Sequence, residues 1–199
     1  FKSEGAATPD MSETQGQRER RPSTVAAFVG ATGGAGTTRT VIEVAAPLAA
    51  DGRDVAVLDA AFATQGLAGY VAGRIDPDVT TLLVDADDAA DLRAGLYGFD
   101  AGDVPGEVAV CPAYAPFTRL ARAKSTAAAE RFESLIRTAA DRFDHVLVDV
   151  APIAANQAVA AVNAADAVAV VAPASDRGAE GIQRCHERLA DVGSGASLV

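Results

Sequence analysis

Residues 25–50 constrain the fold more than any other part of the chain. An apolar run at 25–29 leads into the glycine-rich stretch 31–39, ATGGAGTTR, and an apolar-periodic stretch follows from 40 to 50. A strand, a tight turn and a helix in this order surround one point with main-chain N–H groups and the N-terminus of a helix. The sequence therefore predicts a loop that binds the phosphates of a ligand.

The loop lacks the cation that usually grips a phosphate. Loops of this kind carry a lysine between the last glycine and the Ser/Thr, and this chain has Thr37 there. Losing a charged donor costs roughly 1.5–3 kcal/mol of binding and about 10²–10³-fold in rate. We therefore expect weak nucleotide binding or none, with little hydrolysis. The loop residues expected to contact a nucleotide are Gly33, Gly34, Ala35, Gly36, Thr37, Thr38 and Arg39.

Arg39 is a poor replacement for the lysine. It lies two positions beyond Thr37, so on a helix of about 3.6 residues per turn its side chain leaves roughly 200° away. We do not expect it to restore the missing charge.

The rest of the chain alternates short β-branched runs with helical stretches. The pattern predicts strands at 25–29, 55–58, 108–111, 146–150 and 167–172, and helices at about 37–50, 80–95, 124–142, 154–163 and 176–191. Near-continuous apolar strands that alternate with helices indicate a parallel sheet covered on both faces. The predicted class is therefore α/β, a doubly wound, mostly parallel sheet flanked by helices.

Composition excludes some functions. A net charge of −10 argues against a nucleic-acid surface, which needs a basic patch. Asp outnumbers Glu two to one and only Lys2 and Lys124 are lysines, so the chain resembles a protein from a salt-in halophile or an acidic protein from a GC-rich genome. The two cysteines and two histidines have no metal-ligand spacing, and no segment resembles a signal peptide or a membrane span. These features predict a cytoplasmic protein.

The glycine-rich turn alone is compatible with two ligand classes. Residues 30–36 also resemble the turn of extended short-chain dehydrogenases, in which Asp59 would bind the ribose of NAD(P). Those enzymes need a Tyr-x-x-x-Lys pair, and Tyr70, Tyr97 and Tyr114 are followed at that spacing by Arg, Ala and Thr. A dehydrogenase is thus disfavoured, whereas an NAD(P)-binding module without catalysis stays open.

A second motif resembles the MinD/ParA group of P-loop ATPases. Residues 144–152, DHVLVDVAP, form an apolar strand ending in Asp149 with Ala-Pro two residues on, similar to the Walker B segment of that group. The resemblance implies that Asp149 and Thr38 position Mg²⁺, and we add Asp59 as a further residue of this metal site.

A third motif extends the resemblance to residues 25–192. Residues 164–175, AADAVAVVAPAS, resemble the strand and loop that reach the nucleotide base in the same group, so Pro173 and Ala174 are expected to contact the base. The implied cofactor is ATP or ADP with Mg²⁺. Within the group, the loop is most similar to the CpaE/TadZ branch of pilus-assembly positioning proteins, which often lack the loop lysine.

Two further departures concern dimerisation and hydrolysis. Members that form ATP sandwich dimers carry a lysine just before the glycine pair, where this chain has Thr32, and a water-positioning Asp where it has Ala61. The resemblance thus implies a positioning or scaffolding protein, a pseudo-ATPase that binds ATP or ADP weakly or not at all. A slow ATP-dependent switch ATPase is the alternative within the group.

The resemblance also implies partners and domain limits. It implies a homodimer that works with proteins of a polar or division-site machine. Members of the group often attach to membranes through a C-terminal amphipathic helix, a point on which these residues are silent. We expect a disordered arm at 1–23, of which 1–10 would be an added leader if Met11 is the native start. A P-loop NTPase-like domain at 24–199 would then be cut short at its C-terminus, because residues 197–199 read as the start of a strand.

Overall fold

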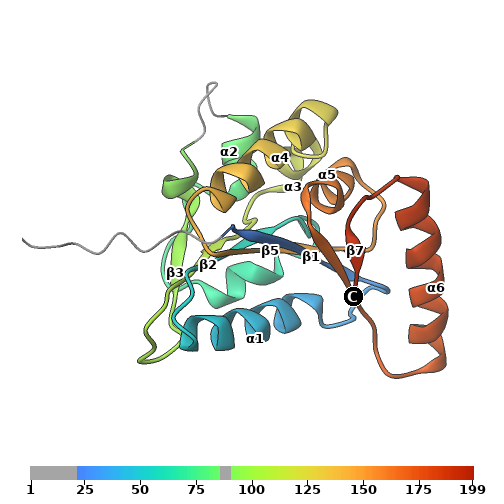
Figure 1. Ribbon diagram of the computed structural model, residues 1–199. Helices are drawn as coiled ribbons and strands as arrows, with labels where there is room; N and C mark the ends of the chain where they lie inside the picture. The colour runs from blue at the N-terminus through green and yellow to red at the C-terminus, as the bar shows by residue number, and fades with distance from the viewer. Residues whose placement is uncertain (1–21, 86–90) are drawn as a thin grey trace, which may run out of the picture.

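Seven strands form one sheet in the computed structural model, which describes residues 22–85 and 91–199 (Figure 1). The strand order is β3-β4-β2-β5-β1-β6-β7, and every neighbouring pair is parallel except β3 with β4. The strands are β1 (Thr24–Gly30), β2 (Val55–Asp59), β3 (Tyr97–Phe99), β4 (Val108–Cys111), β5 (His145–Val150), β6 (Ala167–Val171) and β7 (Ser197–Leu198). The predicted α/β class is confirmed.

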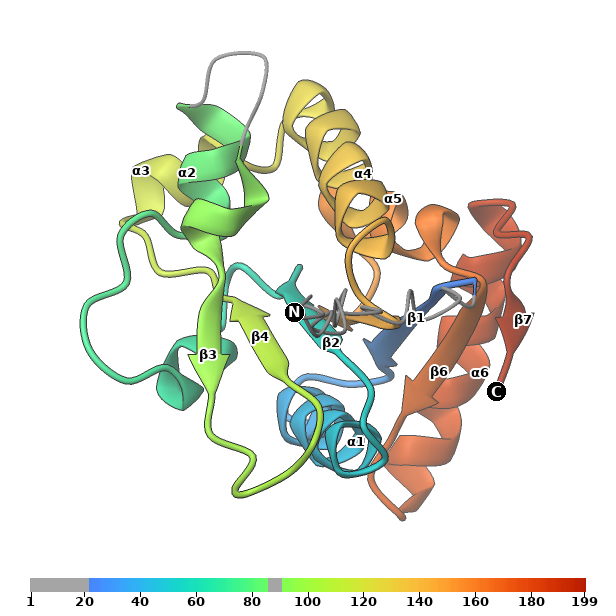
Figure 2. The ribbon, with the colours of Figure 1, turned by 60° about the vertical axis from the view of Figure 1, so that its left-hand side comes forward.

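Helices cover both faces of this sheet. Helix α1 packs on one face, and α2, α4 and α5 pack on the other, as Figure 2 shows with α1 below the sheet and α4 and α5 above it. The helices are α1 (Thr37–Ala50), α2 (Val79–Val84), α3 (Phe117–Arg122), α4 (Thr126–Ala140), α5 (Asn156–Ala164) and α6 (Asp176–Asp191), with 3₁₀ turns η1 (Gly66–Tyr70) and η2 (Leu92–Gly95). In the described ranges, no helix has the length and apolarity needed to cross a membrane.

The two faces bury separate apolar clusters. On the α1 side, Val41 and Ile42 pack against buried strand residues such as Val57. On the other side, the rings of Phe62 and Phe132 meet edge to face, with their centroids 6.0 Å apart. These clusters fix α1 and α4 against the sheet and so fix the ends of the strands between them.

The structure differs from the sequence prediction between residues 80 and 95. The single helix predicted there is wrong, because α2 ends at Val84 and the chain then forms η2 and the edge strand β3. Residues 86–90 lie outside the described ranges. Gly95 of η2 packs closely on α2, since a Cβ there would lie 2.7 Å from Cδ1 of Leu82. Strand β3 has only three residues, with Gly98 at its centre. A strand this short has too few residues for a periodic pattern to predict it.

The helix predicted at 124–142 is present as α4, and a short helix precedes it. Ser125 caps α4, its hydroxyl accepting a hydrogen bond from the N–H of Ala128. Residues 117–122 form α3, which the sequence analysis did not predict. The expected disordered arm falls almost wholly on residues 1–21, outside the described ranges.

The topology brings two loops together at one edge of the sheet. Strand β1 lies between β5 and β6, and all three run in the same direction. Their carboxyl ends therefore meet at the same edge, where open α/β sheets bind their ligands. The loop after β1 and the segment after β5 are the two walls of the site described next.

Candidate nucleotide-binding site

The loop between β1 and α1 presents a series of free N–H groups. Gly34 and Gly36 have φ angles of 75° and 86°, left-handed values that favour glycine. Among the described residues, only Ala35 within the glycine-rich turn donates its N–H inside the loop, to the carbonyl of Thr32. The N–H groups of Gly33, Gly34 and of residues 36–39 find no acceptor there. This set of donors at the start of α1 is suited to a phosphate.

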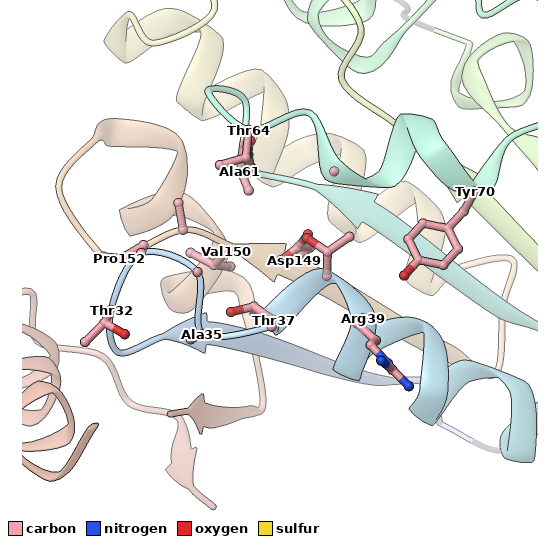
Figure 3. Close-up of a pocket in the computed structure, with 16 residues that line it drawn as sticks. Thr32, Ala35, Thr37, Arg39, Ala61, Thr64, Tyr70, Asp149, Val150 and Pro152 are labelled. Carbon is pink, nitrogen blue, oxygen red and sulfur yellow. Dashed lines mark hydrogen bonds between the residues drawn. The ribbon is translucent and has the colours of Figure 1, made fainter. Parts of the chain in front are cut away.

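Thr37 occupies the lysine position without extending over the loop. A Cβ on Gly30 would lie 2.8 Å from Oγ1 of Thr37, so the hydroxyl packs against the beginning of the loop. Figure 3 shows the Thr37 side chain turned back into the loop. The N–H cradle is therefore formed, and position 37 gives it no positive charge.

Thr38 and Asp149 meet across the site. The Thr38 hydroxyl donates a 2.6 Å hydrogen bond to Oδ2 of Asp149, at the end of β5. The second oxygen, Oδ1, is buried and has no hydrogen-bond partner in the described structure. Burial raises the pKa of Asp149 to about 6, although the Thr38 bond opposes the shift. A hydroxyl beside a carboxylate with a free oxygen fits Mg²⁺.

Asp59 lies beside Asp149, and each of its oxygens accepts a main-chain hydrogen bond. The two residues are paired in register across β2 and β5. Oδ1 of Asp59 accepts from the N–H of Ala61 at 2.8 Å, and Oδ2 accepts from that of Ala113 at 3.1 Å. Burial, followed by the charge of Asp149, raises the pKa of Asp59 to about 8 against these two bonds. Asp59 is fully buried and does not line the cavity.

The loop borders a cavity of about 400 Å³, a size suited to a small-molecule ligand. The segment after β2 closes it opposite the loop, and Figure 3 shows Ala61, Thr64 and Tyr70 along this side. A Cβ on Gly66 would lie 2.8 Å from Oγ1 of Thr38, so the start of η1 packs closely on the Thr38–Asp149 pair. Sequence reasoning missed Thr64, Gly66 and Tyr70, because residues 61–78 have no periodicity that places them.

The other predicted contacts lie apart from the cavity centre. Arg39 is exposed and its Nε is 2.7 Å from Oε1 of Glu43, one turn along α1. In Figure 3 its side chain is directed away from the loop. Pro173 and Ala174 are exposed and do not line the cavity, so their contact with a base stays a prediction.

Among the described residues, the cysteines, histidines and carboxylates form no further metal site. Cys111 and Cys185 are buried free thiols. Across the described residues, no group of three or more His, Cys, Asp or Glu side chains could hold a metal ion. A magnesium ion at this site would thus depend on Thr38, Asp149 and the oxygens of a ligand.

Comparisons with known proteins agree with this geometry. A family model described as an AAA domain matches residues 23–195. The apo structure of McdA from Cyanothece is similar, with 19% identity over 88% of this chain and 69% of that chain and a TM-score of 0.69. No curated protein matches the sequence significantly.

Several similar structures contain nucleotide, and two of them hold ADP with magnesium. One is the septum site-determining protein MinD from Pyrococcus horikoshii with Mg-ADP, 16% identical over 88% of this chain and 68% of that chain, with a TM-score of 0.61. The other is cobyrinic acid a,c-diamide synthase from Mycobacterium smegmatis with ADP and magnesium, 20% identical over 88% and 71%, with a TM-score of 0.68. At such identities the likeness shows a shared fold, and it is the family model that assigns membership. The chain belongs to the AAA-domain family, with the fold of P-loop proteins of the MinD/ParA type.

Proposed function

We propose that the protein is a MinD/ParA-like positioning or scaffolding protein that binds Mg-ATP or Mg-ADP weakly and hydrolyses ATP slowly or not at all. The observation that carries this proposal is the combination of an intact N–H cradle and Thr38–Asp149 pair with a threonine at the lysine position. The N–H groups of the cradle and the N-terminus of α1 can bind an anion even though Thr37 is uncharged.

The metal-binding pair favours ATP or ADP over NAD(P). Asp149 Oδ1 is buried without a partner among residues 22–85 and 91–199, which is costly unless a ligand or a cation satisfies it. A dinucleotide would not supply a cation, whereas Mg²⁺ travels with ATP and ADP. MinD and the cobyrinic acid synthase both hold ADP with magnesium on this fold, which supports the same ligand here. Thr38, Asp149 and the loop N–H groups would hold Mg-nucleotide, the ion neutralising phosphate charge.

Three positions argue against rapid hydrolysis. Thr37 provides no charge over the phosphates, and Thr32 packs against Gly181 of α6, where a Cβ would lie 2.8 Å from Thr32 Cγ2. Ala61 lines the cavity with a methyl group and cannot orient water. Preorganised donors typically contribute about 10²–10³-fold each, and their losses are not additive. A slow switch ATPase remains the second candidate, because Asp149 and Thr38 are in place.

The proposal includes a homodimer and contacts with other proteins. A cytoplasmic homodimer would act on the other proteins of a polar or division-site machine, and with Thr32 packed against α6 its pairing should depend little on ATP. Sedimentation with and without Mg-ATP tests this. A dimer in both conditions agrees with it, and a monomer in both contradicts it.

A calorimetric titration tests the ligand. Mg-ATP, Mg-ADP and NADPH are titrated into one sample in concentrated KCl, and phosphate release is measured in parallel. Weak binding of both adenine nucleotides without turnover supports the proposal. ATP turnover at rates ordinary for P-loop ATPases would contradict the proposal that hydrolysis is slow or absent. Tighter binding of NADPH than of ATP or ADP would contradict the proposed ligand.

A further inference from the structure

A second cavity lies on the other side of the glycine-rich loop. It has a volume of about 240 Å³ and shares Thr32, Gly33 and Pro152 with the nucleotide cavity. Its opposite wall is α6, which contributes three arginines, Arg177, Arg184 and Arg188. The two cavities therefore touch along the loop, and the lysine position of the loop is a threonine, whereas three arginines line the second cavity.

The positions of the three arginines on α6 follow from helix geometry. They are spaced by seven and four residues, so at about 100° per residue their side chains leave α6 within roughly 40° of one another. Gly181 and Cys185 are buried on the adjoining face. A Cβ on Gly181 would lie 3.1 Å from the carbonyl oxygen of Ala31, so α6 approaches the loop closely and directs the arginine row toward it.

The charges in this row are only partly neutralised. Arg188 donates from Nη1 to the carbonyl of Ile153 at 3.0 Å, which holds it near the segment after β5. Arg184 is 3.6 Å from Glu180, a pair in which both side chains are more than half exposed. Arg177 forms no ion pair with any described residue. Weak exposed pairs contribute little, so the pocket keeps a net positive charge in a chain of net charge −10.

The chemistry of the pocket selects its ligand class. Guanidinium groups bind oxyanions through paired, charge-assisted hydrogen bonds, and several of them around one small cavity match a multiply charged tetrahedral group better than a single carboxylate. We propose that this pocket, formed by Arg177, Arg184, Arg188 and the loop at Thr32–Gly33, binds a phosphate-type oxyanion. The anion is a free phosphate compound or the terminal phosphate of a nucleotide held in the adjoining loop. Only the second source rests on the proposed function.

Nuclear magnetic resonance with ¹⁵N-labelled protein tests the pocket directly. Inorganic pyrophosphate is titrated first, followed in separate samples by Mg-ADP and Mg-ATP. We expect saturable shifts for the amides of Thr32 and Gly181 and for the side-chain N–H of Arg184. In the double variant Arg177→Gln/Arg184→Gln the pyrophosphate affinity should fall at least about ten-fold. Arg74→Gln, which removes an exposed arginine paired with Asp76, is the matched control and should change nothing.

The three ligands distinguish a free phosphate compound from the terminal phosphate of a nucleotide. If the double variant weakens Mg-ATP more than Mg-ADP, the anion is the terminal phosphate of the nucleotide. If only pyrophosphate binding falls, the pocket takes a separate phosphate compound, a result that stands even if the loop binds no nucleotide. Shifts confined to residues 36–38, or equal pyrophosphate affinity in the double variant and the wild type, would overturn the proposal. Arg177→Lys/Arg184→Lys keeps the charge and should retain part of the binding, and thermal unfolding checks that each variant is folded.

Discussion

The hydroxyl of Thr38 donates a 2.6 Å hydrogen bond to Oδ2 of Asp149, a residue 111 positions further along the chain. The bond joins the first turn of α1 to the carboxyl end of β5 and leaves Oδ1 of Asp149 buried without a partner. The pair that would position a metal ion is therefore present. The cation that would bind the phosphates is not, because position 37 is a threonine.

Thr37→Lys should restore the missing cation. A Cβ added at any of the loop glycines 33, 34 and 36 would meet no atom within 4 Å, so the loop leaves room for a longer side chain. We expect Mg-ATP to bind roughly ten- to a hundred-fold more tightly, the equivalent of about 1.5–3 kcal/mol. Calorimetry measures the change. Ala50→Lys adds the same charge at the exposed end of α1 and should have no effect, and an unchanged affinity in Thr37→Lys would contradict our account of the loop.

Asp149→Asn should abolish the magnesium dependence of nucleotide binding. The amide keeps the shape of the carboxyl group but removes the negative charge that fits Mg²⁺. The gain in ADP affinity on adding Mg²⁺, measured by calorimetry, should fall at least about ten-fold. Asp103→Asn, at an exposed position before β4, is the control and should behave as the wild type. An undiminished magnesium effect in Asp149→Asn would remove Asp149 from the metal site.

Gly178→Ala should destabilise the protein by about 1–3 kcal/mol. A Cβ at this position would lie 1.9 Å from the carbonyl oxygen of Pro173, so the start of α6 would have to shift. This cost outweighs the gain of up to about 1 kcal/mol from replacing glycine inside a helix. Urea unfolding measures the difference. Gly98→Ala, where a Cβ meets nothing within 4 Å, is the matched substitution and should cost much less.

The ligand-free protein should lose stability as the pH rises from about 4 to 8. The folded protein holds protons on Asp149 and Asp59 with pKa values of about 6 and about 8, whereas both carboxyls have ordinary values of 3.8. The folded state therefore binds more protons in this window, and its free energy of unfolding falls by at most about 1.4 kcal/mol per pH unit for each group.

Urea unfolding between pH 5 and 9 measures this slope. In Asp149→Asn the fall between pH 5 and 7 should be smaller than in the wild type, because one of the two groups no longer titrates. A wild-type stability that rises steadily across the same range would show that neither carboxyl is held protonated.

The periodicity of the apolar residues and the positions of the glycines predicted most of the helices and strands. Helix α1 and helix α6 begin and end where their patterns predict, at 37–50 and 176–191, and the five longer strands lie where the apolar runs are. The prediction failed between residues 80 and 95, where α2 ends at Val84 and the 3₁₀ turn η2 packs Gly95 close to Leu82, a contact that neither residue signals by its type.

The sequence by itself determined the family and the composition of the loop, including the threonine at position 37, because these depend on residues that are neighbours in the chain. Tertiary structure alone decided which distant groups meet. The oxygens of Asp59 accept hydrogen bonds from the N–H groups of Ala61 and Ala113, whereas Oδ1 of Asp149 has no partner among the described residues. The place of Asp59 at the metal stays a prediction. Likewise, Arg177, Arg184 and Arg188 line a cavity with Thr32 only because α6 packs against the loop through Gly181. Such contacts depend on how helices close on a sheet, and spacing along the chain does not specify them.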